Sequence, residues 1–231
     1  MASKGTDMGV KMSETSAQVA QAERDKRLEA ILPHVGFDGW SLASVRAAAS
    51  DLEESEDAFM LWFPEGISDL VGHYLEYQDR RMIEGARAAD IDSMKIRARI
   101  TFLVRSRLEQ AEGERDVIRR TLTFLSLPQN ISFATKRLWK TADIMWRLAG
   151  DRATDYNHYT KRTILSGVYS STLLYWVNDK SEGNADTWAF LDRRIAGVMQ
   201  FEKVKAQVLK QQAQLPNLTR FLGRLRYGSQ G

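Results

Sequence analysis

The residues of this chain that could do chemistry are few and widely spaced. His158 follows Asp155 by three positions, so on a helix both side chains would share one face, as metal ligands often do. A single pair does not complete a site, because a di-iron carboxylate bundle requires a Glu-x-x-His pair on each of two helices. His34 and His73 stand alone, and we interpret them as surface or core residues. The sequence therefore predicts no metal site.

Catalytic motifs are equally sparse. The sequence has no glycine-rich phosphate loop, no Gly-x-Ser-x-Gly elbow and no His-Glu-x-x-His motif. It has no cysteine, which excludes disulfides, thiolate metal ligands and cysteine nucleophiles. Paired carboxylates such as Glu53 and Glu54 lie in charged stretches, where solvation is the simplest interpretation. We therefore expect a protein that is not an enzyme and that uses no cofactor.

Charge is distributed unevenly along the 231 residues. The net charge is +3, but residues 193–231 carry eight basic residues and one acid, so the preceding part is mildly acidic. No apolar run approaches the roughly 18 residues of a membrane-spanning helix. A basic segment attached to an acidic body indicates an anionic partner, either a membrane surface or a nucleic acid.

The elements that would position these residues are all helices, because no period-two alternation is sustained anywhere. The four prolines, Pro33, Pro64, Pro128 and Pro216, each fall between periodic segments and should end helices. Ser41, Ser55 and Asp90 or Asp92 are candidate N-caps, Gly150 is a candidate C-cap, and Thr154 and Asp155 could cap the helix that follows. The predicted helices cover residues 16–32, 41–49, 56–63, 67–87, 93–108, 117–127, 139–149, 156–176 and 186–212.

The first four predicted helices resemble the N-terminal helix-turn-helix of TetR-type regulators. The resemblance rests on the segment RLEAILPHVGFDGWSLASVRAAASDLEESEDAFMLWFPEGISDLV and implies an all-α ligand-binding and dimerisation domain after it. The region of the recognition helix, residues 52–63, has four acids and no base, so it would repel phosphate. We expect a degenerate helix-turn-helix that binds no nucleic acid. The alternative is a TetR-type transcriptional regulator with an apolar ligand.

The later helices are unusually aromatic. Ordinary core packing is one interpretation, and the other is an elongated apolar cavity of the TetR ligand-domain type. A membrane-surface adaptor without a cavity is a third possibility. The side chains predicted to bind lipid in such a cavity are Ile100, Leu103, Val104, Phe124, Phe133, Leu138, Leu165, Tyr169, Leu173, Trp188, Leu191 and Ile195.

The C-terminal segment after Pro216 has the pattern of a short basic amphipathic helix. Its apolar residues recur at i, i+3, i+4 and i+7, with arginines beside them, as in helices that lie in the headgroup region of an anionic bilayer. A final helix that docks on the body is the alternative, and nucleic acid is disfavoured because it offers nothing to the apolar stripe. The predicted membrane-binding residues are Leu218, Arg220, Phe221, Leu222, Arg224, Leu225 and Arg226.

Two strings resemble the ninth coenzyme Q biosynthesis protein family. They are RLAGDRATDYNHYTKR, followed by ILSGVY at 164–169, and DTWAFLDRRI at 186–195. The resemblance, which runs from about Pro33 to Arg226, implies a TetR-like bundle of about ten helices and a homodimer. It also implies an apolar cavity for isoprenoid quinone intermediates or phospholipid, and a C-terminal amphipathic helix that meets membranes. Family members support the di-iron demethoxyubiquinone hydroxylase, to which such a lipid would be presented.

Carried over by position, the family's partner-binding patch falls on Met145, His158 and Tyr159, near Tyr156 and Arg162. His158 stands where animal members have Trp. The implied organisation is a disordered segment 1–15, a helix-turn-helix region 16–88, a lipid-binding and dimerisation domain 89–212, and a membrane-binding helix 213–231. Because the N-terminus lacks a presequence pattern, we expect a bacterial member on the cytoplasmic side of the inner membrane, or the matrix side of the inner membrane if it is eukaryotic.

Overall fold

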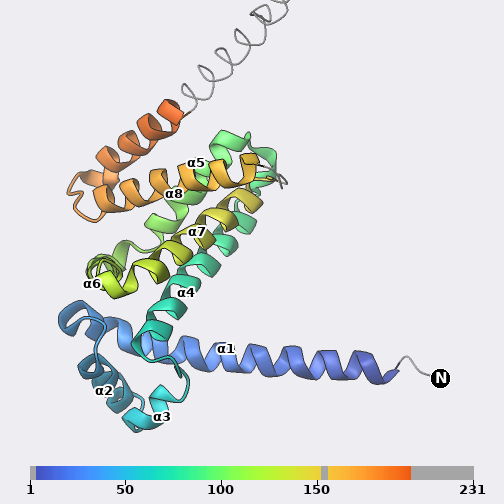
Figure 1. Cartoon of the computed structure of the whole chain (residues 1–231), viewed down its shortest axis with the longest axis vertical. Helices are drawn as coiled ribbons and strands as arrows, with labels where there is room; N and C mark the ends of the chain where they lie inside the picture. Colours follow the sequence, from blue (N-terminus) through green and yellow to red (C-terminus); the bar gives the residue numbers. More distant parts are fainter. Residues whose placement is uncertain (1–3, 152–155, 199–231) are drawn as a thin grey trace, which may run out of the picture.

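The computed structural model describes residues 4–151 and 156–198, and within them the regular secondary structure is entirely helical (Figure 1). This confirms the all-α prediction. Short 3-10 turns cover Ile91–Ser93, Glu112–Glu114, Pro128–Asn130 and Glu182–Asn184. The α-helices are α1 (Lys4–Asp38), α2 (Leu42–Asp51), α3 (Glu56–Met60), α4 (Ile67–Ala88), α5 (Ile96–Glu109), α6 (Arg115–Leu125), α7 (Ile131–Leu148) and α8 (Tyr156–Trp176), followed by a helix over residues 185–198.

Helix α1 differs from its prediction at both ends. It runs through Pro33, where the sequence predicted its end, although an internal proline costs about 3 kcal/mol of helix stability. Leu28, Ile31 and Val35 lie in the core before and after Pro33, so their packing offsets the lost hydrogen bond. The helix also begins at Lys4, within the segment predicted to be disordered, because extending an existing helix is far easier than nucleating one.

The serine caps were predicted correctly. The side chain of Ser41 accepts a hydrogen bond from the Ser44 amide, and that of Ser55 accepts one from the Ala58 amide. Helix α3, however, ends at Met60 rather than Phe63. The amide of Phe63 bonds to the Met60 carbonyl in a turn, which buries the Phe63 ring in the core.

The link between α4 and α5 also differs from its prediction. The N-cap position of α5 is Lys95, whose side chain makes no capping hydrogen bond, rather than Asp90 or Asp92. Asp92 instead pairs with Arg99, whose Nη1 lies 3.2 Å from Asp92 Oδ1, and Asp90 adopts a left-handed conformation with φ of 45°. Neither carboxylate caps α5, and that of Asp92 instead forms an ion pair with Arg99.

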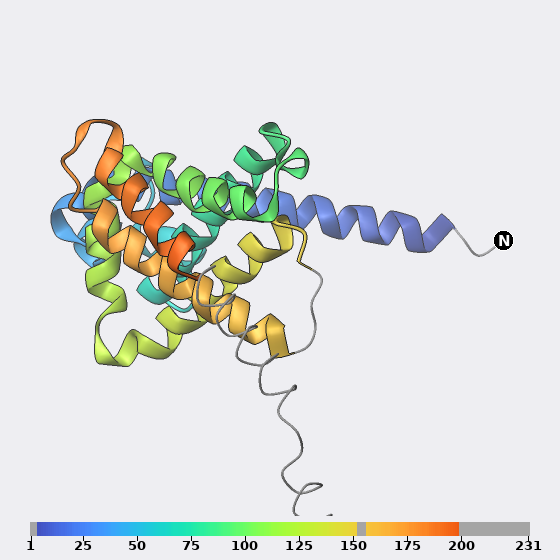
Figure 2. The same cartoon turned by 90° about the horizontal axis from the view of Figure 1, so that it is seen from above.

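Helix α4 joins two layers of the molecule. At one end it packs against α1, and α1 packs against α2, which packs against α3. Along its length α4 packs against α5 and α7 (Figure 1). Helix α8 covers α7 and part of α5, and the helix over 185–198 lies beside α8 in both views (Figures 1 and 2). The core is continuous through this arrangement, so the helix-turn-helix region and the later bundle share α4 as a common wall.

The turn after α7 follows its prediction where it is described. Gly150 has φ of +89°, and its amide bonds to the Arg147 carbonyl while the Asp151 amide bonds to the Trp146 carbonyl. The predicted caps Thr154 and Asp155 lie outside the described residues, as do the end of the last predicted helix and the predicted amphipathic segment 213–231. Within 4–151 and 156–198, no helix combines the length and the hydropathy that crossing a bilayer requires.

The two isolated histidines were predicted to be surface or core residues, and one lies at the surface and one in the core. His34 is at the surface of α1, with Nε2 2.6 Å from Asp51 Oδ2. His73 is buried on α4, with Nε2 2.7 Å from Asp25 Oδ1. Burial, together with the positive charge of Arg24, lowers the pKa of His73 below its usual value. Both histidines therefore tie helices of the N-terminal region together.

Candidate functional site

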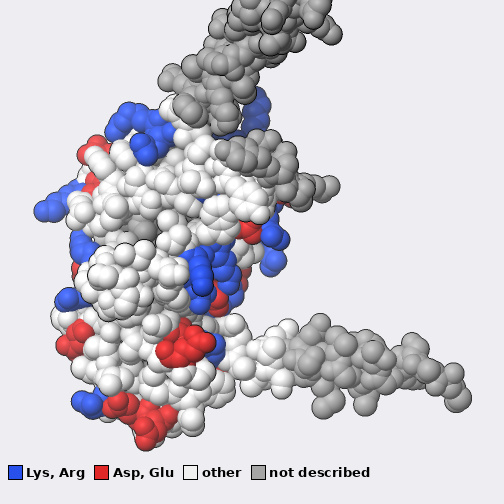
Figure 3. Space-filling model, viewed as in Figure 1, with Lys and Arg blue, Asp and Glu red and all other residues white. Residues whose placement is uncertain are grey.

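An apolar cavity of about 370 Å³ opens among α4, α5, α6, α7 and α8. Four helices supply aliphatic walls, and the exposed surface over α6, α7 and α8 carries few charges, with Lys and Arg side chains at its edges (Figure 3). The volume lies in the range typical of small-molecule sites. The lining side chains are Leu75, Arg107, Leu122, Leu125, Ser126, Ile131, Ala134, Thr135, Arg137, Leu138, Thr141, Tyr169, Ser170, Leu173 and Leu174.

A second apolar pocket, of about 270 Å³, lies between α5, α8 and the helix over 185–198. The two pockets use successive parts of α8, the second taking residues 164–168 and the first taking residues 169–174. The sequence predicted one elongated cavity, whereas these two pockets have no lining residue in common. The lining side chains of the second pocket are Ile96, Arg97, Ile100, Trp146, Ile164, Leu165, Val168, Ile195 and Val198.

The residues predicted to bind lipid fall into four groups. Leu138, Tyr169 and Leu173 line the first cavity, and Ile100, Leu165 and Ile195 line the second. Leu103, Val104 and Leu191 are buried in the core and line neither. Phe124, Phe133 and Trp188 are partly buried and pack against the core from outside both pockets. For these last six residues the structure provides packing and no contact with a cavity.

A buried polar network forms the floor of the first cavity. Arg107 of α5, 3% exposed, donates from Nε to Asp79 Oδ1 on α4 at 2.9 Å and from Nη1 to the Tyr169 hydroxyl on α8 at 2.8 Å. Thr141 of α7 donates to the same Asp79 carboxylate at 3.0 Å. Burial opposes the charge of Arg107, but the nearby oxygens of Tyr169 and Asp79 raise its pKa above the usual range. The network therefore joins four helices through one buried ion pair.

Sequence reasoning missed Arg107, Asp79 and Thr141. A signal was present, because Arg107 follows Val104 by three positions on the apolar face of α5, and Asp79 follows Leu75 by four on that of α4. Opposite charges on the buried faces of two successive helices indicate a buried pair, because an isolated charge in a core is too costly. Thr141 carried no comparable signal.

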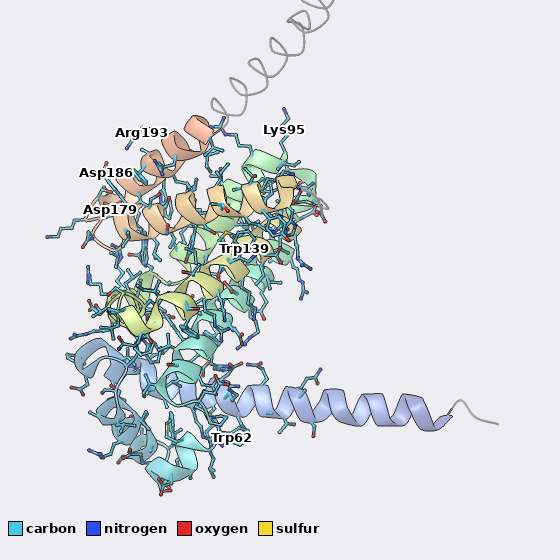
Figure 4. The ribbon with its side chains drawn as sticks, viewed as in Figure 1. Trp62, Lys95, Trp139, Asp179, Asp186 and Arg193 are labelled. Carbon is cyan, nitrogen blue, oxygen red and sulfur yellow. The ribbon has the colours of Figure 1, made fainter. Side chains whose placement is uncertain are left out.

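The predicted partner-binding residues divide between the surface and the interior. Tyr159 is 62% exposed, and its ring lies 5.2 Å from that of His158 and 6.1 Å from that of Trp139 on α7. Figure 4 shows Trp139 near the middle of α7, away from the end of α8 where Asp179 and Asp186 lie. These three rings form an aromatic surface on the α7–α8 hairpin. The side chain of Tyr156 lies outside the described residues.

Met145 and Arg162 need a correction, since neither is accessible to a partner. Met145 is fully buried in the core, and Arg162 is 2% exposed. The guanidinium of Arg162 donates to Asp143 Oδ1 at 2.6 Å and to Asp151 Oδ2 at 3.1 Å, and these bonds pull it inward. Both residues therefore support the hairpin from beneath the aromatic surface.

The helix-turn-helix region presents acids on the described surface. Asp51, Glu53 and Asp57 are exposed on and between α2 and α3, where Figure 3 shows a group of acidic side chains. Arg46 pairs with Glu56 across 3.2 Å, and Glu54 pairs with Arg27 of α1. This surface has the wrong sign for phosphate.

Comparisons with known proteins agree with the family resemblance. A family model described as COQ9 matches residues 131–202. The ubiquinone biosynthesis protein COQ9-B of Xenopus laevis is 31% identical over 210 residues, which cover 88% of this chain and 71% of that protein. Human COQ9 is 30% identical over 210 residues, covering 88% of this chain and 65% of its own length, and rat COQ9 is 32% identical over 188 residues, covering 78% and 60%. The chain thus spans about 60 to 65% of these mammalian relatives, which are named as mitochondrial.

The fold has a solved counterpart. A TetR transcriptional regulator from Nitrosomonas europaea superposes with a TM-score of 0.62 at 22% identity, covering 75% of this chain and 95% of that one. At this identity the likeness concerns the fold alone, and it confirms the TetR-like architecture. Together with the identity and coverage of the Xenopus relative, the matching strings place the sequence in one family. The chain belongs to the COQ9 family, whose members are named as ubiquinone biosynthesis proteins.

Proposed function

We propose that this chain is a non-enzymatic, lipid-binding accessory protein of ubiquinone biosynthesis. It would hold an isoprenoid quinone intermediate or a phospholipid in the first cavity, at a membrane surface, and present it to the demethoxyubiquinone hydroxylase. The observation that carries the proposal is the cavity of about 370 Å³, which is walled by aliphatic side chains and rimmed by exposed ones. Ile131 and Leu174 on its rim are 56% and 55% exposed, which favours an apolar chain lying across them.

The family membership supports the pathway, and the aromatic surface supports the partner. Tyr159, His158 and Trp139 offer large rings on α7 and α8, the kind of anchor that dominates binding between proteins. The basic segment 213–231 would hold the protein at anionic lipid. We propose the inner membrane as the location, on its cytoplasmic side in a bacterium or its matrix side in a eukaryote, and a homodimer as the working form.

Mass spectrometry of lipid extracted from the purified full-length chain tests the proposal. We expect an isoprenoid quinone precursor or a phospholipid in near-stoichiometric amount. The variant Leu173→Trp fills the first cavity and should reduce the bound lipid about fivefold or more. The matched control Leu61→Trp adds the same ring at an exposed position on the α3 side of the molecule and should retain the lipid.

Two results would contradict the proposal. If the folded protein carries no lipid and takes none up from vesicles, it is not a lipid-binding protein. Equal lipid content in Leu173→Trp and Leu61→Trp would show that any bound lipid lies outside the first cavity.

A further inference from the structure

The most deeply buried side chains that line the first cavity are polar, whereas most of its partly exposed and exposed lining side chains are aliphatic. Arg107, Thr141 and Tyr169 line it and are each at most 5% exposed, whereas Ile131 and Leu174 on the rim are more than half exposed. A carrier that leaves the ligand's headgroup in solvent would need the opposite order, with apolar groups deep and polar groups at the rim. This distribution of polar and apolar side chains therefore favours an amphiphile that enters with its polar end first.

The Tyr169 hydroxyl is the free donor on this floor. It accepts a hydrogen bond from Arg107 Nη1, and among the described residues nothing accepts its own proton. Burial raises the pKa of Tyr169, so the phenol keeps that proton at neutral pH. An unused buried donor costs free energy, which an entering acceptor would recover.

The ion pairs of the two lining arginines favour a neutral acceptor over an anionic one. Arg107 is neutralised by Asp79, and Arg137, the other charged lining residue, pairs with Glu76 across 2.5 Å. An anionic headgroup such as a phosphate would find no unpaired cation here and would face two carboxylates close behind the arginines. A neutral acceptor has no such cost.

We propose that the cavity takes an amphiphile head first. A neutral oxygen acceptor, such as the carbonyl of a quinone or a ketone, accepts a hydrogen bond from the Tyr169 hydroxyl, and the hydrocarbon chain leaves across Ile131 and Leu174. This deepens the proposed function and rests on it, because it names the ligand class and the orientation in the same cavity. In this carrying state the polar ring is sequestered, so it is the last part of the ligand to be released.

Paired probes test the orientation on the full chain. Affinities for decylbenzoquinone and for decylbenzene, which lacks the oxygens, are measured by calorimetry. The native protein should bind the quinone about five- to tenfold more tightly, which is the effect of one net hydrogen bond. Tyr169→Phe should bring the two affinities close to equality by weakening quinone binding alone.

Tyr74→Phe is the matched control, since the Tyr74 hydroxyl is equally buried but donates to Glu114 and lies outside the cavity. It should keep the native preference. If Tyr169→Phe also keeps the preference while both probes still bind, the head-first orientation is wrong and lipid binding stands. If neither these probes nor a phospholipid bind the native protein, or Leu173→Trp weakens none of them, the proposed function itself is wrong; if a phospholipid alone binds, only the head-first proposal is wrong. Tighter binding of decyl phosphate than of decylbenzoquinone would overturn the choice of a neutral acceptor.

Discussion

The guanidinium of Arg162 on α8 lies 2.6 Å from the carboxylate of Asp143 on α7, in a position where the arginine is 2% exposed. Its second nitrogen reaches Asp151 beyond the end of α7 and also the carbonyl of His158 at 3.1 Å. One buried side chain thus holds both helices and the backbone under the aromatic surface. The family string that contains Arg162 therefore encodes the support of that surface as well as its exposed rings.

Replacing Arg162 by Met should destabilise the protein by about 3 kcal/mol, because it removes the buried cation shared by Asp143 and Asp151 and leaves them only their more exposed partners Arg147 and Lys161. Denaturant unfolding monitored by circular dichroism measures the change. Arg147→Ala is the control, since Arg147 pairs with the same Asp143 at the surface and should cost less than about 1 kcal/mol. Equal losses in the two variants would show that burial of the Arg162 pair adds nothing.

Stability should fall as the pH drops below about 6.5. The pKa of buried His73 is lowered in the folded state, so the unfolded chain binds the proton more readily. The His73 contribution is fully present above pH 6.5 and is lost as the pH falls towards the folded-state value, by at most about 1.4 kcal/mol per pH unit. His73→Gln should flatten the slope of unfolding free energy between pH 7 and 5, whereas His34→Gln should leave that contribution in place.

Asp179 should control the start of the helix over residues 185–198. Its Oδ1 accepts from the Ser181 amide at 2.8 Å and its Oδ2 from the Thr187 amide at 2.9 Å. Burial raises the pKa of Asp179, but hydrogen bonds from the Thr187 and Ser181 hydroxyls, together with these amides, hold it well below the usual range. Asp179→Ala should cost about 1–2 kcal/mol, as for a lost cap. Faster amide exchange within residues 185–198 is the expected readout. Asp186→Ala should leave the exchange rates unchanged, because Asp186 takes part in this cap through its backbone amide, which donates to the Ser181 hydroxyl.

Tyr159→Lys should weaken binding to the hydroxylase at least tenfold without unfolding the chain. The exposed ring packs against Trp139 and His158, and a lysine would place a charge in the proposed contact. Affinity is measured by surface plasmon resonance on the full chain. Phe37→Lys changes another exposed ring, near the α1–α2 turn and 83% exposed, and should bind normally. An unaltered affinity in Tyr159→Lys would locate the interface elsewhere.

Deleting residues 216–231 should lower binding to anionic vesicles several-fold. The deletion removes an apolar stripe and three arginines, each worth about 1 kcal/mol near an anionic surface. Flotation with vesicles containing phosphatidylglycerol measures the loss, and neutral phosphatidylcholine vesicles provide the comparison. Unchanged flotation would indicate that the segment docks on the body of the protein.

The elements that depend on local chemistry were predictable from the sequence. Ser41 and Ser55 cap helices because a serine side chain can reach an amide three residues ahead, and Gly150 ends α7 because glycine accepts positive φ. Pro33 was wrongly predicted to end α1, because tertiary packing of α1 outweighs the preference of proline to end a helix. Local rules therefore succeeded where neighbouring residues decide the outcome.

The candidate site depends on long-range pairing and was only partly predictable. Arg107 contacts Asp79, 28 positions away in the sequence, and Tyr169, 62 positions away. Helical periodicity can show that each of these residues faces the core, but it does not show which of them are in contact. The aromatic content indicated a cavity, but Phe124 and Phe133 pack outside it while aliphatic Leu75 and Leu122 line it. Residue type alone cannot distinguish the wall of a cavity from the filling of a core.

Leu138 and Trp139 are neighbours on α7 but belong to two different candidate sites. Leu138 lines the first cavity, and Trp139 belongs to the aromatic surface proposed for the partner. A ligand and a partner protein would therefore act on the same turn of one helix. If filling the cavity shifts that turn, thermodynamic linkage requires reciprocity: whatever factor the ligand adds to partner affinity, the partner adds to ligand affinity. Loaded and empty carriers would then differ in their affinity for the hydroxylase, which would let the enzyme dock preferentially on the form that brings cargo.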